Sequence, residues 1–371
     1  MELTLVATCA FGLESVLKRE VQQLGYTVSG SDNGRIKFVS DELAVARSNI
    51  FLRTADRVHI ILKEFRADDF DLLFDGVKSI EWENFIEENG RILVKGRSKD
   101  SKIHSVPVAQ SMTKKAIIER LLEKTGRSEI IEEGTVYPIE IELDKDIARV
   151  TMNTSGEPLF KRGYREETGE APIKETLAAG LVLLSGWNLS EPFVDPFCGS
   201  GTIPIEAAMI KKRIAPGLNR HFLSMKWNFL DKKIWNLAVE EALSMILSFD
   251  EISIYGYDKD PDVIKKAVNN SLSAEVDDIV NFKNVDINML KLKADHGVIV
   301  TNPPYGVRIG DKYELDDLIF RLSDAVCKKN GWATHIISDH PSFQETFGTA
   351  SHKKKLYNGN IKCYYYSYFG N

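Results

Sequence analysis

The first 65 residues alternate between two kinds of hydrophobic spacing. Apolar residues alternate with polar ones, or run together, over residues 2–10, 35–40 and 57–65, which predicts three strands. Residues 12–25 and 42–54 carry apolar residues at helical spacing, and the first of these segments ends at Gly25. Strands and helices mixed over so short a length predict a small α+β domain at residues 1–65.

A second unit of the same kind follows at residues 66–154. Helical spacing covers residues 70–80 and 108–126, and a strand pattern lies between them at residues 91–98. Residues 137–156 have the pattern of two strands joined by a turn at Asp144–Asp146. We therefore expect a second small α+β domain ahead of the rest of the chain.

From residue 155 onward, short apolar strands alternate with amphipathic helices. This alternation predicts an α/β domain at residues 155–371, built on a doubly wound, Rossmann-like parallel sheet. The tail differs, because Asn358–Gly359 between β-rich arms is a strong hairpin signal. We expect that hairpin to form an antiparallel pair at the edge of the sheet.

Composition adds bounds to this picture. The chain has 371 residues, 43% of them hydrophobic, which suits two or three domains with cores of their own. No apolar run approaches the roughly 18 residues of a membrane helix, and the N-terminus lacks the features of a signal peptide. The four cysteines and seven histidines show no metal-ligand spacing. We expect a cytoplasmic protein without a membrane anchor or a metal site.

Charge is unevenly distributed along the chain. The net charge of −6 argues against a uniformly basic nucleic-acid binder, yet residues 91–127 hold ten basic and three acidic residues, a local charge of +7. Such a cluster can attract phosphate; the alternative is a solvated helix face laced by i,i+4 ion pairs. The candidate RNA contacts are Lys95, Arg97, Lys99, Lys102, Lys114 and Lys115.

The segment VDPFCGSGT, residues 194–202, has the pattern of a strand, a glycine loop and a helix start. Gly199 and Gly201 would let backbone N–H groups approach a ligand, in the positive field of the helix N-terminus. The third glycine of a dinucleotide fingerprint is replaced by Pro204, and the lysine of a phosphate-binding loop is missing. The loop therefore favours a nucleoside-like ligand over a triphosphate; the alternative is an ordinary tight turn.

Two later acids complete a nucleoside site. Asp258 ends the next strand, where doubly wound folds place an acid that accepts hydrogen bonds from ribose hydroxyls; a surface turn is the alternative. Asp260, followed by Pro261, has the pattern of a helix N-cap. Asp286 follows a short strand and would accept from an adenine amino group, or merely cap a turn.

The segment VIVTNPPYG, residues 298–306, ends a buried strand in an amide and two prolines. Each residue before a proline is pushed toward extended backbone, so Asn302 and Pro303 are held open. Their carbonyl groups could converge on one amine, while the Tyr305 ring stacks on the flat group that carries it. The alternative is a rigid loop without a ligand.

These motifs carry a family resemblance. DPFCGSGT and TNPPYG, in this order and spacing, resemble the class I S-adenosylmethionine-dependent methyltransferases that modify exocyclic amines. Residues 161–187 and 356–368 resemble THUMP-domain guanine-N2 methyltransferases of RNA, most closely the RlmL-type 23S rRNA family in a stand-alone form. The likeness covers essentially the whole chain. It implies a ferredoxin-like domain at 1–65, a THUMP domain at 66–154 and a methyltransferase domain at 155–371.

The resemblance also implies roles for single residues. Asn302, Pro303 and Tyr305 would hold the guanine. The cofactor S-adenosylmethionine would be held by Asp195, Phe197, Gly199, Gly201, Thr202, Asp258 and Asp286, with Arg162, Tyr164, Pro172 and Lys174 lining its entrance.

Several alternatives stay open at this point. The expected partner is RNA, most directly 23S rRNA or a large-subunit precursor, and the expected assembly is a monomer or weak dimer. Guanine-N2 methylation of tRNA is a close rival, and the same amine motif also serves adenine in DNA and glutamine in proteins. A non-catalytic RNA-binding assembly factor is the alternative of a different class.

Overall fold

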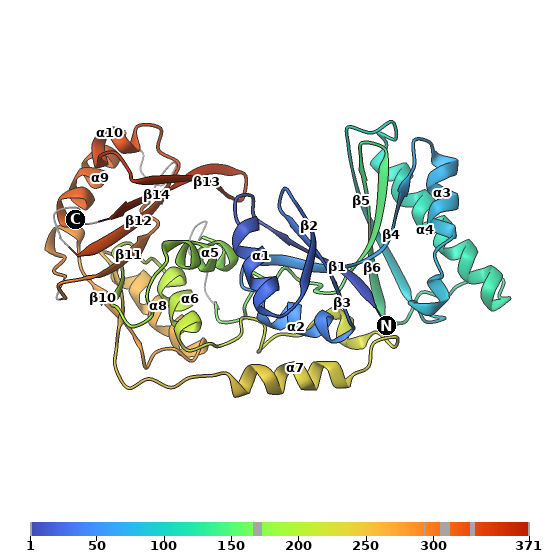
Figure 1. Ribbon diagram of the computed structural model, residues 1–371, viewed down its shortest axis with the longest axis horizontal. Helices are drawn as coiled ribbons and strands as arrows, with labels where there is room; N and C mark the ends of the chain where they lie inside the picture. Colours follow the sequence, from blue (N-terminus) through green and yellow to red (C-terminus); the bar gives the residue numbers. More distant parts are fainter. Residues whose placement is uncertain (1, 166–172, 293, 305–311, 327–330, 370–371) are drawn as a thin grey trace.

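The computed structural model contains two seven-stranded sheets near opposite ends of an elongated molecule (Figure 1). The structure describes residues 2–165, 173–292, 294–304, 312–326 and 331–369, with the side chains of 312–315 left aside. Both sheets combine with helices, which confirms the predicted α/β fold class. In the described residues, no helix is long and apolar enough to cross a membrane.

The first sheet takes all its strands from the front half of the chain, in the order β2-β3-β1-β4-β7-β6-β5. Only the β5–β6 pair is parallel. Its strands are β1 Leu3–Cys9, β2 Thr27–Asp32, β3 Arg35–Ser40, β4 Ala55–Arg66, β5 Arg91–Lys99, β6 Val136–Asp144 and β7 Ile147–Asn153. Its helices are α1 Glu14–Gln23, α2 Leu43–Phe51, α3 Phe70–Lys78 and α4 Val106–Thr125, with a 3-10 turn, η1, at Trp82–Asn84.

The second sheet has the order β10-β9-β8-β11-β12-β14-β13. Five strands are parallel, and the final two form the predicted antiparallel hairpin at the edge. The strands are β8 Phe193–Asp195, β9 Ile254–Asp258, β10 Val280–Asn284, β11 Gly297–Thr301, β12 Trp332–Ser338, β13 His352–Asn358 and β14 Ile361–Phe369. The helices are α5 Glu175–Ser185, α6 Thr202–Lys211, α7 Lys233–Ser244, α8 Pro261–Ser273, α9 Lys312–Val326 and α10 Phe343–Phe347, with 3-10 turns η2 Leu223–Lys226 and η3 Ile287–Met289.

The structure differs from the sequence pattern in three respects. The two front units share one continuous sheet, because β4 pairs with β7. Strand β2 and helix α7 are additional elements; β2 is mostly exposed and therefore lacks the apolar alternation that would reveal it. The loop of the edge hairpin is shifted by one residue, since Asn358 pairs with Ile361 and leaves Gly359–Asn360 as the turn.

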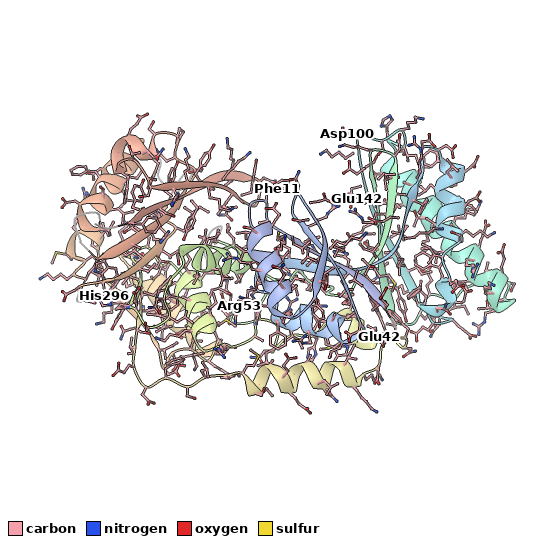
Figure 2. All side chains as sticks on the ribbon, viewed as in Figure 1. Phe11, Glu42, Arg53, Asp100, Glu142 and His296 are labelled. Atoms are coloured by element: carbon pink, nitrogen blue, oxygen red, sulfur yellow. The ribbon has the colours of Figure 1, made fainter. Side chains whose placement is uncertain are left out.

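The segment between α6 and β9 fastens the second sheet to the front half of the molecule. Figure 1 shows α7 running beneath α2, where Arg47 Nη2 lies 2.7 Å from Glu241 Oε1. The Trp227 ring stacks on Tyr137 with centroids 5.7 Å apart, and its indole N–H donates to the Val136 carbonyl. Arg53, labelled in Figure 2, donates to the Ile214 carbonyl from the other side. These contacts place the C-terminal domain firmly against the N-terminal unit.

Candidate functional site

The glycine loop after β8 has the conformation that its sequence predicts. Gly201 lies in the left-handed region at φ 86°, and a Cβ added there would lie 2.8 Å from the Phe282 ring. Gly199 is also left-handed, at φ 51°, but an added Cβ would meet nothing within 4 Å. Packing against Phe282 therefore requires glycine at position 201. At Gly199 the absence of a side chain leaves the backbone accessible to a ligand.

Asp258, at the end of β9, is tied to this loop. Its Oδ2 accepts from the backbone N–H of Gly199 at 3.1 Å and its Oδ1 from that of Asp260 at 3.0 Å. Burial raises the pKa of the Asp258 carboxyl, and the two backbone hydrogen bonds oppose that rise. An ionised carboxylate has about four acceptor positions. Two of them remain free for a ligand.

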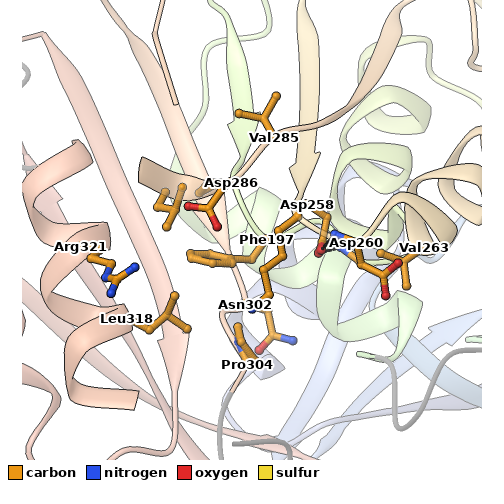
Figure 3. Close-up of a pocket in the computed structure, with 14 residues that line it drawn as sticks. Phe197, Asp258, Asp260, Val263, Val285, Asp286, Asn302, Pro304, Leu318 and Arg321 are labelled. Carbon is orange, nitrogen blue, oxygen red and sulfur yellow. Dashed lines mark hydrogen bonds between the residues drawn. The ribbon is translucent and has the colours of Figure 1, made fainter. Parts of the chain in front are cut away.

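A pocket opens beside these groups (Figure 3), at the carboxyl ends of β8, β9 and β11. Its volume is about 400 Å³. From β8 the chain continues to β9 and β10 on one side, whereas from β11 it continues to β12 on the other side. The β8–β11 pair is therefore the point at which the strand order reverses, and open α/β sheets bind ligands at such a point. The lining residues are Pro196, Phe197, Gly199, Asp258, Lys259, Asp260, Val263, Val285, Asp286, Ile287, Asn302, Pro304, Leu318 and Arg321.

Asp286 lies on the pocket wall next to apolar side chains. Its Oδ1 accepts from the backbone N–H of Asn288 at 2.9 Å and from the Asn288 side chain at 2.7 Å, so it caps the turn η3. Its second oxygen accepts no hydrogen bond from the residues that the structure describes. Phe197, Val263 and Ile287 line the same pocket. A flat ring bearing an amine would find both apolar walls and an acceptor here.

Asn302 also reaches the pocket, directly after the fully buried strand β11. Its Oδ1 is buried and finds no hydrogen-bond donor among the residues that the structure describes. A buried carbonyl without a donor costs free energy, and such atoms mark places where a ligand completes the hydrogen bonding. Pro303 is buried and Pro304 lines the pocket beside it. Tyr305 lies outside the described residues.

Asp195 connects the glycine loop to the segment that carries Asn302. Its Oδ1 accepts from the Thr301 hydroxyl at 2.6 Å and from the Phe197 N–H at 3.1 Å, and the residue is 1% exposed. The carboxylate therefore fixes the end of β11, from which Asn302 projects, to the start of the glycine loop. Burial raises the pKa of Asp195 to about 7.

The raised pKa predicts a dependence of stability on pH. A folded-state pKa above the unfolded one means that the fold favours the protonated carboxyl, so stability is lost as pH rises through about 7. Between pH 5 and 7 the free energy of unfolding should fall by about 2 kcal/mol on this account. Asp195→Asn stays neutral and should lack that decline. Denaturant unfolding of both proteins across this pH range measures the difference; parallel curves would contradict the assignment.

Two of the predicted cofactor-entrance residues lie elsewhere. Arg162 and Tyr164 are buried in a polar cluster around Glu206, away from the residues that line the pocket. Tyr164 donates to Glu206 Oε1 at 3.2 Å, and Arg162 donates to the Leu159 and Arg53 carbonyls. The physical reason is that Glu206 is fully buried and needs donors. In the described structure these two side chains do not line the pocket, and their role at the cofactor entrance stays a prediction.

Three further predicted contacts have mixed outcomes. Thr202 begins α6 as expected, but its buried hydroxyl accepts from Arg165. Lys174 precedes α5 and lines a separate cavity of about 230 Å³ between the N-terminal unit and the hairpin. Its ammonium group lies 4.9 Å from the centre of the Phe160 ring. Pro172 lies outside the described residues.

Several residues that support the site were not predicted. Thr301 holds Asp195, and Asn270 donates to the Ser200 carbonyl at 2.9 Å from the buried side of the glycine loop. Thr301 directly precedes the NPPY motif, so its position was a usable signal, whereas nothing in the sequence near Asn270 indicates its role. Helix α9 contributes Leu318 and Arg321 to the pocket, which depends on tertiary packing.

The predicted RNA-binding residues do not form one uniformly basic surface. Lys95, Arg97 and Lys99 lie on one face of β5, beside three acids of β6 in the parallel register. Three of the other cations form ion pairs, and the pairs are Lys102–Asp68, Lys114–Glu132 and Lys115–Glu119. Arg97 also pairs with Glu142 at 2.8 Å. Part of the +7 charge is therefore neutralised by acids from other segments.

In the described part of the chain, no group of three or more histidine, cysteine or acidic side chains is arranged to hold a metal ion. Asp258 and Asp286, which line the pocket, accept hydrogen bonds from the backbone N–H groups of Gly199, Asp260 and Asn288.

Comparison with known proteins gives three family matches along the chain. Residues 4–59 match the RlmL ferredoxin-like domain, residues 67–153 match the THUMP domain, and residues 162–367 match the RMKL-like methyltransferase domain. The sequence resemblance to THUMP-domain methyltransferases is thereby confirmed. Glu206, which organises the cluster around Arg162, lies inside the third match.

Individual relatives agree with these matches. The chain is 42% identical to YpsC of Bacillus subtilis, provisionally named an RNA methyltransferase, over 99% of this chain and 96% of that protein. It is 35% identical to the ribosomal RNA large subunit methyltransferase K/L of Buchnera aphidicola over 97% of this chain, but spans only 53% of that relative's length.

A solved structure extends the comparison to three dimensions. The protein SMU.472, provisionally named a methyltransferase and complexed with SAH, has 39% identity to this chain and a TM-score of 0.94. The alignment covers 100% of this chain and 98% of that one. The chain therefore belongs to the RMKL-like methyltransferase family, with an RlmL-type ferredoxin-like domain and a THUMP domain ahead of the catalytic domain.

Proposed function

We propose that this protein methylates the exocyclic N2 amine of a guanine in RNA, and that this RNA is 23S rRNA. The observation that carries the proposal is the buried Oδ1 of Asn302, which accepts no hydrogen bond from the residues that the structure describes and lies at a pocket that also holds Asp258 and the glycine loop. A substrate amine would supply a donor for this oxygen. Family membership supplies the reaction type, methyl transfer.

The cofactor is S-adenosylmethionine, and the pocket fits it. The open backbone at Gly199 would hold the methionine part, Asp258 has acceptor positions left that would take two ribose hydroxyls, and Asp286 has one that would take the adenine amine. When bound, the cofactor supplies a methyl group already activated by its sulfonium centre. No metal ion or covalent nucleophile is needed for this chemistry.

The protein's own contribution is to hold the guanine amine. The amine lone pair is delocalised into the purine ring, so acceptors on its two protons are needed to turn that lone pair toward the methyl group. We propose Asn302 and the Pro303 carbonyl as those acceptors. Tyr305, which lies outside the described residues, is the ring predicted from the sequence to stack on the base. Positioning of this kind can contribute up to roughly 7–11 kcal/mol. Residues 302–304 contain no titratable group, so the amine proton leaves to water.

RNA is the substrate because two domains ahead of the catalytic one belong to RNA-modifying families. The THUMP match supports RNA over DNA adenine or protein glutamine, which the same amine motif can serve. The names of the relatives favour rRNA over tRNA. The target base must leave its stack to reach the pocket, which favours loops or strained helices. We propose that the protein acts on this substrate in the cytoplasm. We also propose that it does so as a monomer or weak dimer.

Methyl transfer from radiolabelled S-adenosylmethionine into separated rRNA and tRNA fractions tests the proposal. Label in the large rRNA is expected. Label in tRNA would favour the rival substrate. Protein that binds RNA but gives no calorimetric heat with S-adenosylmethionine would instead be an assembly factor.

The front domains are expected to supply RNA affinity independently of the cofactor. Lys114→Glu with Lys115→Glu should weaken RNA binding by roughly tenfold, because it reverses two charges of the basic segment and breaks their ion pairs. Cofactor binding should stay within about twofold of the original protein, as both residues lie on α4. Calorimetry with S-adenosylmethionine measures this. Loss of cofactor affinity in the variant would contradict the claim that the front domains bind RNA independently of the cofactor.

A further inference from the structure

One face of the edge hairpin carries an alternating set of lysines and tyrosines. At every second position of the β13–β14 ladder a lysine is paired with a tyrosine, as Lys353↔Tyr366, Lys355↔Tyr364 and Tyr357↔Lys362. Because directly opposed residues share a face of the sheet, these six side chains lie together. We call them the lysine–tyrosine face.

The opposite face of the hairpin fixes this orientation. Leu356, Cys363 and Tyr365 are buried there, and the Tyr365 hydroxyl donates to the Leu181 carbonyl of α5 at 2.8 Å. A slip of one residue would exchange the two faces and expose these apolar groups. The lysines are therefore held outward by the hydrophobic pattern of the hairpin itself.

The tyrosine rings position the ammonium groups. Lys353 Nζ lies 4.0 Å from the centre of the Tyr364 ring, and Lys362 Nζ lies 5.2 Å from the same centre. Lys355 Nζ lies 5.2 Å from the Tyr357 ring. Tyr366 is buried against Phe343, whereas Tyr357 and Tyr364 remain half-buried. Cation–π contacts thus order three lysines next to two partly accessible rings.

Acids of the described residues do not neutralise the positive charge of this face, because none of them forms an ion pair with Lys353, Lys355 or Lys362. The hydrogen bond from Lys362, followed by the field of Lys353 and Lys355, lowers the pKa of the Tyr364 hydroxyl. Most of the predicted cations near β5 and α4 are paired with acids, so this face is the less compensated of the two basic regions.

Its place in the fold relates it to the catalytic pocket. The hairpin turn lies at the same edge of the sheet as Asn302, because β13 runs parallel to β11 and β12. Tyr366 packs in the same core as Ile319 and Leu322 of α9, the helix whose Leu318 and Arg321 line the pocket. At the turn, Tyr357 contacts Phe11 with ring centroids 5.9 Å apart. The turn end of the face therefore lies at the same end of the strands as the pocket and contacts the N-terminal unit.

Edge strands often carry lysines to prevent pairing with other chains. That role would account for the charges on β13, but it does not require two half-buried tyrosines on the same face or a lysine on the inner strand β14. Basic groups interleaved with aromatic rings are the arrangement that binds single-stranded nucleic acid.

We propose that the lysine–tyrosine face binds the single-stranded RNA that flanks the target guanine, with the lysines on phosphates and with Tyr357 and Tyr364 stacking on bases. The inference rests on the proposed function for the identity of the nucleic acid. It assigns to the catalytic domain its own RNA contacts, separate from those of the THUMP domain.

The test compares two triple variants that remove equal charge. Lys353→Gln, Lys355→Gln and Lys362→Gln change the face, while Lys232→Gln, Lys233→Gln and Lys265→Gln change exposed lysines on α7, its preceding residue and α8. The probe is a fluorescein-labelled, single-stranded RNA 15-mer of mixed sequence. Its dissociation constant is measured by anisotropy over a range of salt concentrations, and binding of S-adenosylmethionine is measured by calorimetry as the check on folding.

The face variant is expected to bind the probe at least tenfold more weakly than the control variant. The slope of log Kd against log salt should fall by about 2, from three lost phosphate contacts at about 0.7 each. Tyr357→Leu should weaken binding at least fivefold without changing that slope, because stacking is insensitive to salt. Cofactor binding should be unaffected in every variant.

Equal RNA binding by the two triple variants would overturn the inference and leave the lysines as edge protection or as a contact for another protein. Failure of the proposed function would look different, since the unchanged protein would then bind no cofactor or transfer no methyl group to RNA.

Discussion

Asn302→Ala is expected to lower kcat by roughly 100- to 1000-fold, the usual effect of removing one preorganised hydrogen-bonding group from a reacting centre. The side chain projects from the end of β11, and Thr301 beside it is fixed to Asp195 by the 2.6 Å hydrogen bond. The backbone that carries Asn302 is therefore held in place. The Asn302 Oδ1 accepts no hydrogen bond from the residues that the structure describes. Without it, the amine lone pair is no longer turned toward the methyl group.

Single-turnover kinetics with saturating RNA and cofactor measure this effect. Asn302→Asp is the matched comparison, because it keeps an acceptor at the same place and should retain more activity than the alanine variant. Affinity for S-adenosylmethionine should stay within about threefold in both, since Asp258 and Asp286 are untouched. An alanine variant with the original kcat would refute the role given to Asn302.

Asp258→Ala is expected to weaken cofactor binding by roughly 100-fold or more. The change removes two acceptor positions for ribose hydroxyls, and hydrogen bonds to charged groups are worth about 1.5–3 kcal/mol each. It also releases the Gly199 N–H, which Asp258 holds at 3.1 Å, and so loosens the glycine loop. Both effects act on the cofactor before any chemistry.

Calorimetric titration with S-adenosylmethionine and with its demethylated product measures the loss. Asp262→Asn is the control, because Asp262 is exposed in the first turn of α8 and does not line the pocket. The kcat of Asp258→Ala at saturating cofactor should fall less than the affinity. A variant whose kcat collapses while the affinity is kept would place Asp258 in the chemistry instead.

The sequence predicted the parts of this molecule that local rules determine. Gly201 must be glycine because its φ is positive and its Cβ position is filled by Phe282, and a glycine turn after a strand indicates such a site. Asp260 with Pro261 predicted the N-cap of α8, which the structure confirms. Asp258, Asp286 and Asn302 meet at one pocket because parallel strands end at one edge.

Other features depend on contacts between distant segments and were beyond the sequence pattern. The motif around Arg162 resembles the family as expected, but only the fold shows that Glu206 draws its side chain away from the pocket. For the basic segment at residues 91–127 the sequence indicated ion pairs only along the helix, whereas the fold also brings Glu140 and Glu142 of β6 beside β5. The lysine–tyrosine face becomes visible only when the register of β13 and β14 is known.

The central claim is methylation of guanine N2 in large-subunit rRNA through Asn302. Nucleoside mass spectrometry of 23S rRNA from a strain that lacks this protein, complemented with the original or with Asn302→Ala, tests it most directly. We predict the loss of one N2-methylguanosine in the deletion strain, restored by the original protein but not by the variant. An unchanged N2-methylguanosine content, or loss of a methylated adenine instead, would contradict the account.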